Sequence, residues 1–185
     1  GGRTHMFIKG LKKTVLALGL MSVAAPALAL QCVPYARETS GVEIFGNART
    51  WWGQAAGRYE RGYAPKVGAV MAFKPTRSMP IGHVATVSQI VSEREVLVSH
   101  ANWSLINGRR GQIERNVRVV DVSESGDWSK VKVWYAPLKD LGTSSYPLFG
   151  FIYNNPGAAT APAAPREPLS LPADTLRLAT LEAGA

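Results

Sequence analysis

The order of the local patterns along the chain predicts an α+β domain with an antiparallel sheet. Helical signals come first. Residues 33–39 carry a proline near their start and Gly41 just beyond their end, both favourable positions. Residues 48–56 follow Asn47, a residue type that caps helices. After Pro65 the pattern changes to short apolar or alternating runs. Because helices precede strands instead of alternating with them, we expect N-terminal helices packed on a small antiparallel β-sheet.

Five strands are expected after the helices, each bounded by turn residues or a change in apolar pattern. Alternation is clearest from residue 83 to about residue 91, where every second side chain is expected on one face. Residues 126–135 are expected to form a turn and a structural strand. The predicted strands cover residues 68–73, 83–91, 95–101, 113–120 and 131–135.

Composition divides the chain into three zones. Residues 1–29 hold a leading hexapeptide typical of a cloning scar or upstream extension, then lysines, an apolar run and small residues ending at Ala29. That order is typical of a secretory signal peptide, and an uncleaved anchor is the competing interpretation. Residues 30–153 form the predicted globular domain, and residues 154–185 an Ala/Pro-rich flexible tail. We expect an exported protein of the periplasm or extracellular space, with no stable membrane anchor after cleavage near Ala29.

Charge and residue types argue against two classes of protein. The chain carries 21 basic and 13 acidic residues, a net charge of +8. Four basic residues lie in the leader, so 17 against 13 remain, a net charge of +4. That excess is spread along the chain, which speaks against a nucleic-acid binder and suits an anionic surface such as a cell envelope. One cysteine and two histidines beyond the hexapeptide are a poor zinc-ligand set, so neither metal nor cofactor is expected.

The single cysteine of the chain, Cys32, follows the predicted leader almost directly. It has three interpretations: a lipid-attachment point, a buried filler or a nucleophile. Lipid attachment requires a small residue immediately before the cysteine, and Gln31 stands there instead. At the start of the first predicted helix, the helix dipole and free N–H groups favour a thiolate. The same N–H groups are candidate donors to an oxyanion.

Two histidines are candidate partners for Cys32. His83 begins a predicted strand directly after Gly82, and an imidazole there would accept the thiol proton and return it to a leaving amine. His100 and Asn102 stand two apart on the next predicted strand, so we expect them on one face. If the two strands form a hairpin, that face meets His83 and supplies a residue that orients its ring. From the residues alone, surface or turn-capping roles stay open.

Five short motifs occur in an order that resembles a known family. They are Cys32-Val33-x-Tyr35-Ala36, Gly46-Asn47-Ala48 with Trp51 or Trp52, Pro65-x-x-Gly68-Ala69-Val70, Gly82-His83-Val84-Ala85-x-Val87 and His100-x-Asn102-Trp103. The set resembles the CHAP family of cysteine, histidine-dependent amidohydrolases and peptidases, which is related to the NlpC/P60 peptidases. The resemblance covers about residues 31–135. It implies a papain-like fold and cofactor-free hydrolysis of amide bonds in bacterial peptidoglycan, the expected partner.

The resemblance also assigns roles to individual residues. Cys32 corresponds to the nucleophile, which forms a thioester, and His83 to the general base. The family often has an acid where His100 stands and an asparagine where Asn102 stands, so His100 is predicted to orient His83 with Asn102 in support. A neutral imidazole stabilises an imidazolium less well than a carboxylate does. The alternative is therefore a catalytically weak or inactive module that binds cell wall or an envelope partner.

Aromatic residues are candidates for the substrate groove, because their faces suit sugars and peptide backbones. The predicted substrate-binding residues are Tyr35, Trp52, Trp103 and Gln31, the last as an aid to the oxyanion. Packing in the core is the competing interpretation for the tryptophans. The cleaved bond, the origin of the wall and the oligomeric state are not predicted.

Overall fold

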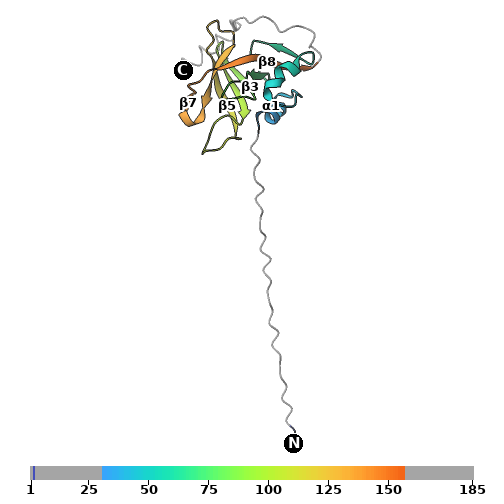
Figure 1. Ribbon diagram of the computed structural model, residues 1–185, viewed down its shortest axis with the longest axis vertical. Helices are drawn as coiled ribbons and strands as arrows, with labels where there is room; N and C mark the ends of the chain where they lie inside the picture. Colours follow the sequence, from blue (N-terminus) through green and yellow to red (C-terminus); the bar gives the residue numbers. More distant parts are fainter. Residues whose placement is uncertain (1, 3–30, 157–185) are drawn as a thin grey trace, which may run out of the picture.

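The computed structural model shows two helices beside one curled antiparallel sheet within the residues that it describes, 2 and 31–156 (Figure 1). Nearly all of the predicted leader and of the predicted tail lies outside the described residues. The elements are α1 (Cys32–Ser40), α2 (Ala48–Ala55), β1 (Tyr59–Gly62), β2 (Val70–Phe73), β3 (His83–Ser92), β4 (Glu95–Ala101), β5 (Ile113–Asp121), β6 (Lys130–Tyr135), a 3-10 turn (Ala136–Leu138), β7 (Asp140–Leu141) and β8 (Tyr146–Pro156).

The sheet is larger than the small one that the sequence predicts. Both predicted helices and the five predicted strands are present, with ends shifted by at most two residues. Strands β1, β7 and β8 were not predicted, and β8 ends three residues beyond the predicted domain boundary. Its sequence contains Pro147, Gly150 and two asparagines, which are turn signals rather than strand signals. Gly150 is required there, because a Cβ atom would lie 2.5 Å from the Gly62 carbonyl oxygen and 2.8 Å from the Trp52 ring.

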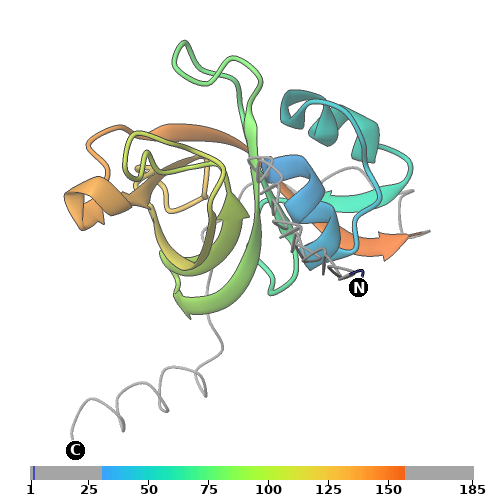
Figure 2. The same ribbon diagram turned by 90° about the horizontal axis from the view of Figure 1, so that it is seen from below.

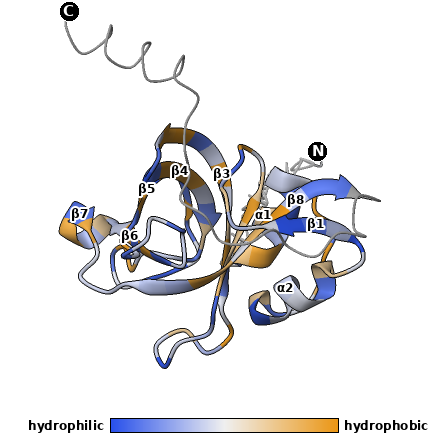
Figure 3. Ribbon diagram, turned by 90° about the horizontal axis from the view of Figure 1, so that it is seen from above, coloured by the Kyte–Doolittle hydropathy of each residue, from blue (hydrophilic) through white to orange (hydrophobic). Residues whose placement is uncertain are grey.

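The sheet curls until it is barrel-like. Its strand order is β1-β8-β2-β3-β4-β5-β6-β7, every pair is antiparallel, and β8 pairs with β6 as well as with β1 and β2. Figures 2 and 3 show the curled part, β4 to β7, on one side of the molecule and both helices with β1 on the other. The domain is therefore β-rich, with the helices beside a nearly closed sheet.

Strand β2 separates two hydrophobic cores, which explains its unbroken apolar sequence. All four of its residues are buried. Val70 and Ala72 pack toward the helices, in a cluster with Trp51 and Ile152. Met71 and Phe73 belong to the other cluster, inside the curl of the sheet. Alternate side chains of a strand point to opposite faces, so a strand between two cores is apolar throughout.

The start of β3 and the end of β4 meet at one edge of the sheet because the two strands form an antiparallel hairpin. This confirms the hairpin on which the pairing of His83 with His100 depends. Helix α1 packs on the same two strands, and the hydroxyls of Thr39 and Thr86 lie 2.6 Å apart between α1 and β3. Helix α1 and the β3–β4 hairpin, which are distant in sequence, thus meet at one edge.

Gly82 fixes the start of β3 against α2. Its φ is +72°, and a Cβ atom there would lie 2.9 Å from the backbone nitrogen of Arg49. That nitrogen donates a 2.8 Å hydrogen bond to the Ile81 carbonyl. Helix α2 therefore approaches this glycine closely. Among the helices that the structure describes, none combines the length and apolar character needed to cross a membrane.

Candidate active site

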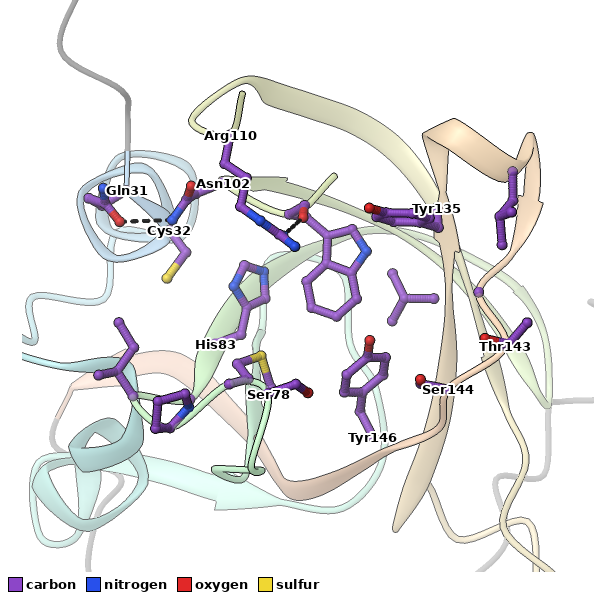
Figure 4. A pocket seen from close by; sticks show the side chains of 18 residues that line it. Gln31, Cys32, Ser78, His83, Asn102, Arg110, Tyr135, Thr143, Ser144 and Tyr146 are labelled. Atoms are coloured by element: carbon purple, nitrogen blue, oxygen red, sulfur yellow. Dashed lines mark hydrogen bonds between the residues drawn. The ribbon is translucent and has the colours of Figure 1, made fainter. Parts of the chain in front are cut away.

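Cys32 and His83 lie beside each other on the wall of one pocket of about 630 Å³ (Figure 4). Cys32 is the first residue of α1, and its sulfur atom points into the pocket from the helix side. His83 is the first residue of β3 and its ring points into the same space from the sheet side. The other lining residues are Gln31, Ser78, Met79, Pro80, Ile81, Gly82, Asn102, Trp103, Arg110, Val133, Tyr135, Leu138, Gly142, Thr143, Ser144 and Tyr146.

The thiol of Cys32 is protonated in the resting protein. Only 7% of the residue is exposed, and this burial raises the pKa of the thiol above its ordinary value. The backbone N–H groups of Val84, Val33 and Cys32 act in the opposite direction and do not offset it. The N–H groups at the helix start favour the thiolate as the sequence predicts, but burial outweighs their effect. Attack by the sulfur therefore requires a base that removes its proton.

His83 is held by His100 through a direct contact between rings. The Nε2 atom of His83 and the Nδ1 atom of His100 lie 3.1 Å apart. Burial lowers the pKa of His83 well below its ordinary value, with smaller contributions from His100 and Arg110. Burial also lowers the pKa of His100 to about 3. Both rings are therefore neutral at neutral pH.

One arrangement of the protons on these two neutral rings allows His83 to act as the base for Cys32. If the Nε2–H group of His83 donates to His100, the Nδ1 atom of His83 is left unprotonated and can accept the thiol proton. His100 then carries its own proton on Nε2, a buried atom without a hydrogen-bond partner among the described residues. In this arrangement His100 is a neutral hydrogen-bond acceptor for His83.

Asn102 supports Gln31 rather than His83. Strand β4 ends at Ala101, and Asn102 follows in a left-handed conformation with a φ of 66°. Its side-chain amide donates a 2.9 Å hydrogen bond to the Oε1 atom of Gln31 (Figure 4). The expectation that Asn102 lies on the same strand as His100 is wrong, because β4 ends at Ala101. The contact orients Gln31, whose own amide group remains to donate beside Cys32.

Of the predicted groove aromatics, Trp103 lines the pocket and two others do not. The Trp103 ring lies 4.9 Å from the ring centre of His83, and it stacks on His100 at 5.5 Å. Tyr35 is 3% exposed within α1 and is not a lining residue. Trp52 stacks on Phe149 at 6.3 Å and is likewise outside the lining. Both are therefore placed to hold helices on the sheet.

The lining residues that the sequence analysis did not predict include Tyr146, Tyr135 and Arg110. Tyr146 opens β8 and packs edge-on against Trp103 with ring centres 5.0 Å apart. Tyr135 ends β6, in a segment predicted to be only structural. Arg110 comes from the loop between β4 and β5. The tyrosines reach the site only because β8 pairs with β6, a contact without a local sequence signal. Arg110 lies eight residues after Asn102, and this nearness in sequence to a predicted site residue was its only local signal.

Residues 24–102 match the family model of the CHAP domain. Over these residues the chain is similar to the CHAP domain. The predicted resemblance is confirmed, and the match includes Cys32, His83, His100 and Asn102. CHAP domains are generally hydrolases that act on peptidoglycan, and the match supports a papain-like fold. A search of curated proteins finds no match to the chain. Within the described part of the chain, His, Cys, Asp and Glu residues form no cluster that could hold a metal ion.

Proposed function

We propose that the protein is an exported cysteine amidase or peptidase that cleaves amide bonds of peptidoglycan through a thioester on Cys32. One observation carries the proposal: a buried thiol and a neutral imidazole share one pocket, and both lie in the segment that matches the CHAP model. The pocket is large enough for a peptide or sugar unit, and Trp103, Tyr135 and Tyr146 supply apolar faces for it.

The proposed reaction uses the proton arrangement of the two histidines. The Cys32 thiol gives its proton to Nδ1 of His83 while the sulfur attacks the amide carbon. His83 then protonates the leaving nitrogen, the C–N bond breaks, and the amine departs. Water attacks the thioester next: His83 takes one proton from the water, the C–S bond breaks, and the acid product leaves as the thiol is restored. Two donors are available for the oxyanion, the side-chain amide of Gln31 and the first-turn N–H groups of α1.

A second candidate function is a CHAP module that binds wall or an envelope partner without hydrolysis. Two observations favour it: burial raises the pKa of the Cys32 thiol, and the partner of His83 is a neutral ring where the family often has an acid. Such a site would keep the groove and lose much of the driving force for proton transfer. The two candidates therefore differ in turnover and not in affinity for the wall.

Zymography on purified cell walls separates the two candidates. Wild-type protein is expected to clear the wall, and the Cys32→Ala variant is expected to bind the wall without clearing it. Mass spectrometry of the released muropeptides then identifies the cleaved bond. Equal clearing by both proteins would refute the thioester mechanism. Wall binding without clearing by the wild type would establish the module instead. Cell fractionation of the full chain tests export, which rests on the leader sequence alone.

A further inference from the structure

The pocket is lined by one charged side chain among its described residues, that of Arg110. In Figure 4 the side chain of Arg110 passes Asn102 and extends over His83. It is close enough to His83 to lower the pKa of that imidazole. A cation thus stands beside the two groups proposed to perform the reaction, without an acidic residue in the same lining.

Arg110 is held in place without being neutralised. Its Nη1 group donates a hydrogen bond to the backbone carbonyl of Trp103. Among the described residues, the ion pairs join Lys66 to Glu60, Arg94 to Asp121 and Arg118 to Glu95, so Arg110 takes part in none of them. A guanidinium has five N–H donors. One contact to a carbonyl therefore leaves most of its hydrogen-bonding capacity directed to whatever enters the pocket.

The position of Arg110 is unfavourable for proton transfer from Cys32 to His83 when no anion is bound. A positive charge near His83 opposes the imidazolium that must form when Cys32 loses its proton. An anion bound at the guanidinium would cancel that field at the moment when the imidazolium appears. The arrangement is therefore better suited to a negatively charged substrate than to a neutral one, in both binding and proton transfer.

We propose that Arg110 is a specificity-determining residue that binds a free carboxylate of the substrate next to the scissile amide. The proposal rests on the proposed function and names its substrate class: stem peptides whose acidic residue is unmodified, in preference to those in which it is amidated. The planar guanidinium matches a carboxylate with paired N–H donors, a match that a carboxamide lacks in charge and geometry.

Two synthetic muramyl tripeptides test the proposal. They carry alanine, glutamate and lysine in the stem and an amidated C-terminus, and they differ only in whether the glutamate α-carboxyl is free or amidated. This places the carboxylate within one residue of each amide along the stem. Wild-type protein is expected to cleave the acid form with a kcat/KM about tenfold higher than the amide form, the size expected of one charge-assisted contact.

Three variants of the full chain complete the experiment. Arg110→Gln is expected to lose the preference by a fall in kcat/KM on the acid form alone, and Arg110→Lys to retain part of it. Arg109→Gln removes the neighbouring exposed charge, which is outside the lining, and is expected to keep the wild-type preference. Equal cleavage of both peptides by the wild type would overturn the proposal. So would an undiminished preference in Arg110→Gln.

Binding to the Cys32→Ala variant separates failure of this proposal from failure of the proposed function. Isothermal titration calorimetry with the same two peptides requires no turnover. Tighter binding of the acid form, lost in the Cys32→Ala/Arg110→Gln double variant, supports the role of Arg110 even if the wild type cleaves neither peptide. Equal binding of the two peptides by Cys32→Ala overturns it even if the wild type cleaves both.

Discussion

Replacing His100 by aspartate changes the partner of His83 from a neutral ring to a carboxylate. The Nδ1 atom of His100 lies 3.1 Å from Nε2 of His83. An aspartate or asparagine side-chain oxygen stands the same number of bonds from the backbone as that Nδ1 atom. Both His100→Asp and His100→Asn therefore keep an acceptor at this place, and only the aspartate adds charge. The asparagine variant is the matched control for the lost ring.

The expected effect of the charge can be estimated from the geometry. Unit charges about 4 Å apart attract by about 4 kcal/mol at an effective dielectric constant of about 20. Burial of the carboxylate opposes this gain, so the pKa of His83 should rise by about one to three units in His100→Asp. Each unit is about 1.4 kcal/mol in favour of the imidazolium. The thiolate–imidazolium form of Cys32 and His83 gains the same free energy, whereas in His100→Asn it gains none.

Alkylation measures this form directly because Cys32 is the single cysteine of the chain. The rate of iodoacetamide labelling at neutral pH, followed by mass spectrometry, should be about tenfold or more higher in His100→Asp than in His100→Asn. Thermal melts of both variants establish that they are folded. Equal labelling rates in two folded variants would refute the view that His100 acts on Cys32 through His83.

Two further predictions concern stability. Burial lowers the pKa of His83 and His100 below the unfolded value of about 6.5, so the unfolded chain binds more protons than the folded chain below that pH. The free energy of unfolding should therefore fall as the pH drops from about 6.5 toward 4, by at most about 1.4 kcal/mol per histidine per pH unit. Urea denaturation at a series of pH values measures this. Gly82→Ala should lower the free energy of unfolding by about 2 kcal/mol more than Gly57→Ala. The two glycines have nearly the same φ, +72° and +73°, so the backbone strain is matched. A Cβ atom at Gly82 meets the Arg49 backbone, whereas one at Gly57 meets nothing within 4 Å.

Each stability prediction has an outcome that contradicts it. The His83→Gln/His100→Asn double variant lacks both buried rings and should show a flatter pH dependence than the wild type. An equal slope in the two proteins would assign the acid sensitivity to other groups. For the glycines, Gly82→Ala could lower the free energy of unfolding no more than Gly57→Ala does. That result would show that α2 moves away from the added Cβ atom at little cost. The start of β3 would then not be held as tightly as the distances imply.

The elements of the fold with a local signal were predictable, and those without one were not. Residues 83–92 alternate in polarity, so β3 was expected. Strand β8 contains two prolines and a glycine, and it pairs with β1 and β2 from the other end of the domain. The closure of the sheet by β8 and β6 is a long-range contact. Tyr135 and Tyr146 were therefore not predicted as site residues, because their positions depend on that closure.

The sequence by itself determined the proposed chemistry of the protein: one cysteine at a helix start, a histidine after Gly82 and a second histidine on the next strand. Spacing and residue type are sufficient for this, because they decide which groups can react. Only the tertiary structure decided how those groups behave. Burial makes Cys32 a neutral thiol and both histidines neutral bases. The turn after Ala101 directs Asn102 to Gln31, and a loop brings the charge of Arg110 over the pocket. Ionisation and orientation depend on what surrounds a side chain, and its surroundings come from segments far away in the sequence.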